Sequence, residues 1–297
     1  MSDLDPTLLG TFLAVLDAGR ISAAAKAIHL SQPAVTAQIR KLEDALGASL
    51  FVRSVRGVTP TERGLRLETY ARRVRTLLAE AVAQLAATDE HRGPLIVAAS
   101  TTIAAHVLPV LLAAFRAQHP AVPLHVHVEN TEHVVEEVRS GRVPLGLVEG
   151  HAWASGVRLE PYLDDEIVPV MGRDATFTVR HARDLEHVPL LWREAGSGTR
   201  AVVERALVRA GVRRRRVRSL DVELGSTEAI VGGAVAGLGL AFVSRRSVRA
   251  HLDAGLVRLV PGLSLVVQRT FRWALPTGAL SGPAAAFHAL ALRTPVG

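Results

Sequence analysis

Three clusters of hydroxyl residues and glycines stand where a strand-like segment gives way to a helix-like one. They are Ser100-Thr101-Thr102, Gly196-Ser197-Gly198-Thr199-Arg200 and Gly225-Ser226-Thr227. Backbone N–H groups and hydroxyls at a helix start favour an anion, and glycine lets an anion approach the backbone. Helix capping alone explains any single cluster, because Ser and Thr are common capping residues. Two or three clusters that each lie between a strand and a helix favour a site for an anionic ligand.

Apolar spacing and stop signals predict three short helices in the first fifty residues. The expected helices are one after Pro6 that ends at Gly19, one over 23–28 that Ser22 caps, and one that Ser31 caps and Gly47 ends. Pro33 falls in the first turn of the third helix, where its missing N–H costs little. Two helices, a tight turn and a third helix with a polar start are typical of a helix-turn-helix.

The start of the third helix carries side chains that can read base edges in a major groove. Gln32 can pair with an adenine through two hydrogen bonds, Thr36 can donate or accept, and Pro33 with Ala34 can contact a thymine methyl group. The helix starts at Ser22 and Ser31 favour phosphate. The alternative for Gln32 and Thr36 is an ordinary solvated helix end.

A small hairpin and a long helix are expected next. Leu50-Phe51-Val52 and Gly57-Val58 predict a wing that carries Arg53 and Arg56, which suit the DNA backbone or minor groove. Thr61 is expected to cap a helix over 62–88 with apolar residues along one side. Such a helix between domains favours pairing with its copy in a second subunit, the alternative being packing on its own domain.

From residue 94 onward, strand-like and helix-like segments alternate, which predicts parallel sheets with helices on both faces. The expected strands are 95–99, 124–129, 145–149, 167–171, 190–193, 240–243 and 265–273, and the expected helices are 103–118, 131–140, 199–210 and 227–236. The uncharged stretch 94–115 is long enough to span a bilayer. A buried strand followed by a buried helix explains it better, because polar residues and Pro109 interrupt it.

Composition narrows the classes of function. The chain has 297 residues, which suggests two domains, a formal net charge of +7 and no cysteine. The absence of cysteine excludes disulfides, thiolate zinc sites and cysteine nucleophiles. An acidic N-terminus without an apolar segment predicts no secretory signal and a cytoplasmic location. His125 and His127 share a strand face without a third metal ligand, and the arginine run at 213–216 is expected to be a solvated loop.

The motif residues of the first part of the chain occur in one order and at one spacing. They are Phe12, Ser22, Ala24-Ala25, Leu30-Ser31-Gln32-Pro33-Ala34-Val35, Ile39, Leu42-Glu43, Leu46-Gly47, Leu50-Phe51, Arg53, Arg56, Thr61 and Gly64. This pattern resembles the DNA-binding domain of LysR-type transcriptional regulators. The chain length, the long connecting helix and the alternation of strands and helices extend the resemblance to essentially the whole chain. Arg63 stands where the family usually has Ala. Ala37 stands where many members have a basic residue, which implies one fewer basic contact with DNA.

The resemblance implies an α/β protein in three parts. They are a winged helix-turn-helix at 1–61, a linker or dimerisation helix at 62–90, and a two-lobed, periplasmic-binding-protein-like effector domain at 91–297, with lobe I over 91–165 and 268–297 and lobe II over 166–267. The implied partners are double-stranded DNA, further copies of the chain as a dimer of dimers, and RNA polymerase. No cofactor or metal is implied beyond a small effector.

The implied effector site lies between the two lobes. The expected effector-binding residues are Ser100, Thr101, Thr102, Glu149, Ser197, Gly198, Thr199 and Ser226. Residues 193–200 and 224–230 resemble the branch that contains carbon-fixation and sulfur-metabolism regulators, whose effectors are anionic. Glu149 and Glu194 could each be a structural partner for an arginine, or could exclude ligands with extra negative charge.

Two other classes of function remain as alternatives. An enzyme is disfavoured because residues 196–199 match neither a P-loop nor a nucleophile elbow, and Gly237-Leu238-Gly239 precedes a strand instead of following one. A transport-binding protein would share the two-lobed architecture but not the first ninety residues.

Overall fold

The computed structural model describes residues 4–54, 57–86, 93–150, 155–212, 220–260, 263 and 265–296. Contacts between Cα atoms divide the chain into two units, one built on the first ninety residues and the other on most of the remainder. Three expectations lie outside the described residues: the position of Arg56, the end of the long helix near residue 88, and the arginine run at 213–216. The side chain of Arg53 also lies outside them.

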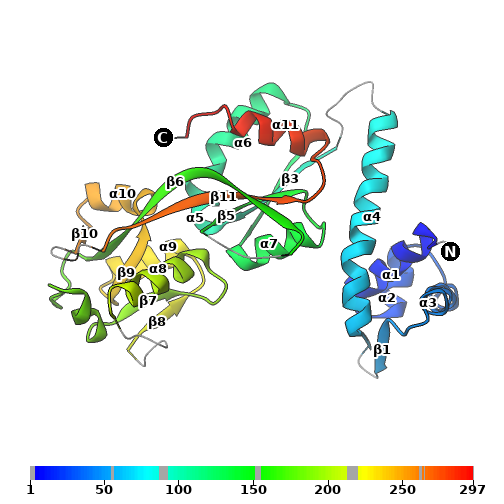
Figure 1. The fold of residues 1–297 in the computed structure, drawn as a ribbon, viewed down its shortest axis with the longest axis horizontal. Coiled ribbons are helices and arrows are strands. Elements are labelled where there is room, and N and C mark those ends of the chain that lie inside the picture. The colour runs from blue at the N-terminus through cyan, green and yellow to red at the C-terminus, as the bar shows by residue number, and fades with distance from the viewer. Residues whose placement is uncertain are drawn as a thin grey trace. The chain divides into compact units, whose positions relative to one another are not determined.

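The first unit contains the expected helix-turn-helix (Figure 1). Its helices are α1 (Pro6–Ala18), α2 (Ile21–Ala27) and α3 (Gln32–Leu46). Gly19 ends α1 and Gly47 ends α3, both in the left-handed conformation that glycine adopts without strain. Ser31 caps α3, since its Oγ accepts from the N–H of Ala34 at 3.3 Å. The expected cap at Ser22 is wrong: α2 begins at Ile21, two residues before the expected start, after an extended Arg20 that makes no side-chain cap.

The wing and the long helix follow as expected. β1 (Phe51–Ser54) pairs antiparallel with β2 (Gly57–Pro60), and α4 runs from Glu62 to Ala86. Thr61 caps α4 by accepting from the N–H of Gly64 at 3.0 Å. A Cβ at Gly64 would overlap the carbonyl oxygen of Leu50, so only glycine lets α4 begin this close to the wing. No single described helix could span a membrane by length and apolar character, although α1 and α2 together, bent by 120°, pass that test.

The second unit is built on one mixed sheet. Its strands are β3 (Leu95–Ser100), β4 (Leu124–Glu129), β5 (Leu145–Glu149), β6 (Val157–Gly172), β7 (Leu190–Arg193), β8 (Val222–Leu224), β9 (Leu240–Ser244), β10 (Val257–Leu259) and β11 (Val267–Pro276). The order is β4-β3-β5-β11-β6-β9-β7-β8, with β10 beside β6. β4, β3 and β5 run parallel, as do β8, β7 and β9, while β6 and β11 join the two groups antiparallel.

The sheet therefore has two lobes connected by β6 and β11, as Figure 1 shows. We call the part with β3, β4 and β5 lobe I and the part with β7, β8 and β9 lobe II. The expected parallel pairing is present within each lobe, but the two crossing strands pair antiparallel, so the sheet is mixed. β6 begins well before the expected 167–171. The sequence did not indicate its first half, because that half is only partly buried and lacks a continuous apolar run. β8 and β10 have three residues each and gave no signal in the sequence.

Helices cover the sheet in both lobes. They are α5 (Thr101–His106), α6 (Leu108–Gln118), α7 (Thr131–Arg139), α8 (Gly198–Arg209), α9 (Thr227–Val235), α10 (Arg245–Asp253) and α11 (Gly282–Ala291). The single helix expected over 103–118 is two helices that meet at Val107. Pro109 accounts for the break, because in a continuous helix its ring would clash with the carbonyl four residues earlier and it lacks the N–H that would continue the ladder. The sequence analysis missed α10, which begins with two arginines, and the alanine-rich α11.

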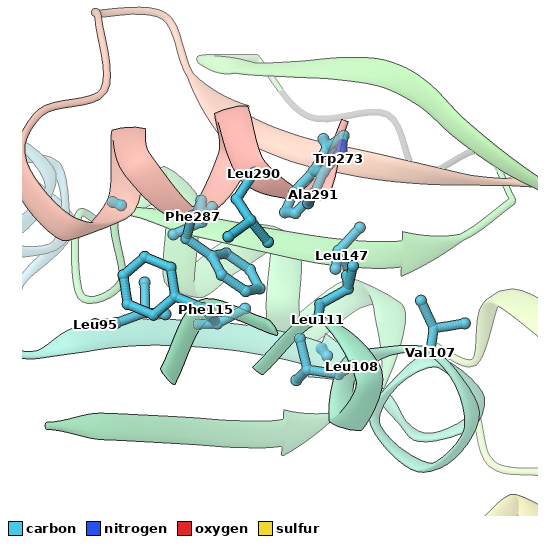
Figure 2. Close-up of a cluster of buried hydrophobic side chains, with 14 of the residues drawn as sticks. Leu95, Val107, Leu108, Leu111, Phe115, Leu147, Trp273, Phe287, Leu290 and Ala291 are labelled. Carbon is cyan, nitrogen blue, oxygen red and sulfur yellow. The ribbon is translucent and has the colours of Figure 1, made fainter. Parts of the chain in front are cut away.

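Lobe I has an aromatic core between its sheet and the helices α6 and α11 (Figure 2). Phe115, Trp273 and Phe287 are fully buried there. The rings of Phe115 and Phe287 pack edge to face with centroids 5.6 Å apart, and those of Trp273 and Phe287 do so at 6.1 Å. Because Trp273 belongs to β11, this core anchors one of the two crossing strands in lobe I.

Candidate functional site

The exposed face of α3 presents polar and basic side chains in a row. Gln32, Thr36 and Arg40 follow one another at four-residue spacing, which places them on one side of the helix. Together with Pro33, Ala37, Lys41 and Asp44 they line a shallow recess of about 720 Å³. Gln32 and Arg40 are exposed and Thr36 is half-buried, so this face is free to meet a partner.

The other described residues expected to contact DNA lie on α2, at the start of α3 and on β1 of the wing. Ser31 is exposed at the start of α3, Ala34 is half-buried in its first turn, and Ser22 is exposed on α2. Arg53 lies on β1 of the wing. The sequence analysis did not single out Arg40 and Lys41, although the four-residue spacing from Gln32 through Thr36 to Arg40 is a signal that could have found Arg40.

A second group of residues gathers where the helix starts of lobe I and lobe II meet. Glu149, at the end of β5, accepts hydrogen bonds from the N–H of Thr102 at 3.1 Å and from the hydroxyl of Thr199. The Nη1 atom of Arg269 donates to Glu149 Oε2 at 2.8 Å and to Thr199 Oγ1 at 2.8 Å. Thr102 belongs to lobe I, Thr199 to lobe II and Arg269 to the crossing strand β11. Glu149 therefore holds all three parts of the domain together.

The charge of Glu149 is set by these contacts. Its side chain and that of Arg269 are almost fully buried, with exposed fractions of 2% and 1%. Burial alone would raise the pKa of Glu149. The charge of Arg269 and the hydrogen bonds from Thr199 and Thr102 outweigh burial and lower that pKa to about 2. Glu149 is thus an ionised carboxylate inside the protein. Arg269 also donates from Nε to the buried Asp165 at 2.7 Å.

Three threonine hydroxyls and one arginine form a neighbouring cluster across the lobes. Thr101 Oγ1 lies 2.9 Å from Thr227 Oγ1, and Thr102 Oγ1 lies 3.2 Å from the same atom. The Nη1 atom of Arg193 donates to Thr101 at 2.8 Å and to Thr227 at 3.0 Å. Arg193 is held in place by Glu194, which accepts from its Nε and Nη2 atoms at 2.8 Å each. Thr101 and Thr102 come from lobe I, whereas Thr227 and Arg193 come from lobe II.

The structure gives the expected hydroxyl residues different roles. Ser197 caps α8 by accepting from the N–H of Arg200 at 3.4 Å, and Ser226 caps α9 by accepting from the N–H of Ala229 at 3.0 Å. Thr199 and Thr227 enter the contacts between the lobes. The Oγ of Ser100 is buried and makes no hydrogen bond. The sequence analysis placed Thr227 in a hydroxyl cluster but chose its neighbour Ser226 as the effector-binding residue, and it did not single out Arg193 or Arg269 as ligand groups.

Close packing at the start of α8 completes the site. A Cβ at Gly198 would overlap the carbonyl oxygen of Glu149, so glycine is required for lobe II to approach lobe I this closely. The N–H of Glu132 donates to the carbonyl of Gly196 at 3.2 Å, which is a further contact between the lobes. Beside it, Ser197 and Gly198 border a recess of about 830 Å³ between α7 and α8. Among the described residues, no group of three or more potential ligands could hold a metal ion.

Comparisons with known proteins agree with this arrangement. Residues 6–65 match the model of the bacterial regulatory helix-turn-helix protein, lysR family, and residues 88–295 match the LysR substrate binding domain. A probable RuBisCO transcriptional regulator of Nostoc sp. is 31% identical over 279 residues, covering 91% of this chain and 82% of that protein. The HTH-type transcriptional regulator CysL of Bacillus subtilis is 32% identical over 253 residues, covering 82% of each.

A solved structure has the same fold over nearly the whole chain. The crystal structure of ArgP from Mycobacterium tuberculosis superposes with a TM-score of 0.73 at 22% identity, covering 98% of this chain and 97% of that one. The two family models together account for both units of the chain, the helix-turn-helix with its wing and the two-lobed α/β domain. The chain therefore belongs to the LysR family of DNA-binding transcriptional regulators with an effector-binding domain, and it is not an enzyme.

Proposed function

We propose that this regulator reads its operator with α3 and responds to a small anionic effector bound where the two lobes meet. On α3 the reading residues are Gln32, Pro33, Ala34 and Thr36, while Ser22, Ser31 and the wing arginines Arg53 and Arg56 contact phosphate or the minor groove. The exposed row on α3 supports this assignment, because such side chains at the start of a helix reach base edges in the major groove.

One observation carries the proposal for the effector site: hydroxyls from both lobes meet at Arg193. The lobes contact each other through Thr101, Thr102, Thr199 and Thr227, so a ligand that enters must exchange contacts with both. A ligand that prefers one arrangement of the lobes shifts the population toward that arrangement. Ser100, Glu149, Ser197, Gly198 and Ser226 complete the proposed site.

The proposed assembly is a homotetramer in the cytoplasm. Its dimers form through α4, whose Leu65, Tyr70, Leu77 and Leu78 are exposed in the single chain, and RNA polymerase is the further partner. Exposed large apolar side chains along a helix favour a second copy of that helix as the partner. A change in lobe arrangement would alter the spacing or the bend of DNA that the N-terminal domains hold.

The test is fluorescence anisotropy with DNA from immediately upstream of this gene, against scrambled DNA, over a salt series. The proposal predicts binding that is tighter on the upstream DNA by about a thousandfold at matched salt. The double substitution Thr101→Ala/Thr199→Ala should abolish any effector response and leave basal operator affinity intact. Equal, steeply salt-dependent binding on both DNAs would show phosphate attraction alone, and loss of basal affinity in the double variant would make these threonines structural.

A further inference from the structure

Two ends of opposite electrostatic character face each other in the contact region between the lobes. One end holds Arg193 with the hydroxyls of Thr101, Thr102 and Thr227. The other end holds the carboxylate of Glu149. The two ends adjoin at Thr102, whose N–H donates to Glu149 at 3.1 Å and whose hydroxyl lies 3.2 Å from that of Thr227. A ligand between them is therefore exposed to both.

The Arg193 end is rich in donors. Three threonine hydroxyls carry three protons, and the two contacts among these hydroxyls use two of them. One hydroxyl proton therefore remains to donate. The two N–H groups of Arg193 Nη1 donate to Thr101 and Thr227, and a ligand that displaces these hydroxyls would accept from the same two groups. Glu194 binds the other side of the guanidinium group, so Nη1 stays directed at the hydroxyls. Donors that converge in this way suit an oxyanion.

The Glu149 end has the opposite character. Both oxygens of Glu149 already accept hydrogen bonds, and an ionised carboxylate cannot donate one. Its cation, Arg269, is shared with the buried carboxylate of Asp165, so these three groups sum to a formal charge of −1. Arg246 lies 3.6 Å from Asp165, and because its side chain is partly exposed, solvent screens its charge more than the charges of the buried groups. A ligand with a second negative charge near Glu149 would meet repulsion that burial strengthens.

We propose that Glu149 is a charge filter: the effector binds through one singly charged oxyanion group at Arg193, and Glu149 rejects ligands with a second negative charge beside it. This inference rests on the proposed effector site and adds the charge class of its ligand. Arg269 acts through Glu149 as a positioning residue, because it touches the carboxylate from the side of β11.

The test compares inorganic sulfate and methanesulfonate as probes. Both carry their oxygens on a tetrahedral sulfur atom, but sulfate has two negative charges and methanesulfonate has one. Tryptophan fluorescence of the full chain reports binding, because Trp153, Trp192 and Trp273 all belong to the effector domain and the first ninety residues contain none. At matched ionic strength, the wild-type protein should bind methanesulfonate at least about tenfold more tightly than sulfate. Glu149→Gln keeps the size of the side chain and removes its charge, so this preference should disappear or reverse.

Two controls separate charge from other effects. Glu160→Gln removes a partly exposed carboxylate that pairs with Arg158, and it should leave the preference unchanged. Thr227→Val removes a hydroxyl without changing charge. It should therefore weaken the binding of both probes and leave the ratio of their dissociation constants unchanged. Circular dichroism checks that each variant is folded, and the wild-type ratio tests the proposal even where Glu149→Gln does not fold.

A wild-type preference for sulfate, an unchanged ratio in folded Glu149→Gln, or binding of neither probe would each overturn the charge filter. Operator binding measured on the same preparations separates this failure from that of the proposed function. Intact operator binding without a charge preference overturns only the filter, whereas loss of operator recognition in the wild-type protein overturns the regulator assignment itself.

Discussion

Glu149→Gln should destabilise the effector domain in a pH-dependent way. The lowering of the Glu149 pKa from 4.5 to about 2 corresponds to about 3 kcal/mol of folding free energy at ~1.4 kcal/mol per pKa unit. The side chain is 2% exposed, so solvent screening does not reduce this figure much. Gln resembles the protonated acid, and the variant should lose about 3 kcal/mol at pH 7.

The sign of the pH dependence follows from the direction of the shift. A carboxylate whose pKa is lower in the folded than in the unfolded protein stabilises the fold fully above about pH 4.5. That stabilisation is lost progressively as the pH falls from 4.5 toward 2. The free-energy difference between wild type and Glu149→Gln should therefore narrow to about half near pH 3.

The assay is urea unfolding followed by tryptophan fluorescence at pH 7, 4 and 3, which reports the effector domain alone. Glu160→Gln is the matched control, because its ion pair with Arg158 is 40% to 51% exposed and should contribute less than about 1 kcal/mol. A loss below about 1 kcal/mol at pH 7 for Glu149→Gln would contradict a stabilising charge at Glu149, as would a free-energy difference between wild type and Glu149→Gln that stays constant down to pH 3.

Three further predictions concern other parts of the chain. In anisotropy titrations, Gln32→Ala should lower the discrimination between operator and scrambled DNA by about 1–3 kcal/mol. Lys41→Ala should weaken binding to both DNAs and lower the slope of log affinity against log salt concentration by about one. His29 has a φ of 56° in the turn between α2 and α3, so His29→Gly should raise the unfolding free energy by about 0.5–1 kcal/mol in urea titrations followed by circular dichroism, and a loss would contradict this. Gly198→Ala should destabilise the effector domain by about 1–3 kcal/mol because its methyl group would overlap Glu149, while Gly232→Ala, with open space around it, should be neutral or stabilising.

The helix-turn-helix was predictable because its signals are local. Gly19, Ser31, Gly47 and Thr61 end or cap helices through contacts with residues at most four positions away. The break in the helix expected over 103–118 was also encoded locally by Pro109. The first half of β6 was not predictable in this way, because its pairing with β11 joins residues about a hundred positions apart and its side chains are only partly buried.

The same distinction applies to the effector site. The helix starts beside Thr101 and Thr199 could be predicted from hydroxyl clusters. Residues that cap a helix or bind an anion at its start are neighbours in the sequence, so the cluster is visible without the fold. The arginines were not found: Arg193 is 92 residues from Thr101 in the sequence, and Arg269 is 120 residues from Glu149. Only the fold brings these groups together, and a lone arginine in a strand carries no signal of the carboxylate or hydroxyl that it will meet.

Control of DNA binding by the lobe arrangement is tested most directly by locking the lobes together and measuring DNA binding. The chain has no cysteine, so the double substitution Thr101→Cys/Thr227→Cys introduces a single possible disulfide, between two side chains whose hydroxyls are 2.9 Å apart. Operator affinity and bend are measured on the oxidised and reduced forms of the same protein, with cross-linking confirmed by mass spectrometry. If the lobe arrangement controls the DNA-binding domains, the two forms should differ in operator affinity by about fivefold or more, or in DNA bend. Identical affinity and bend in the fully cross-linked and reduced proteins would contradict it.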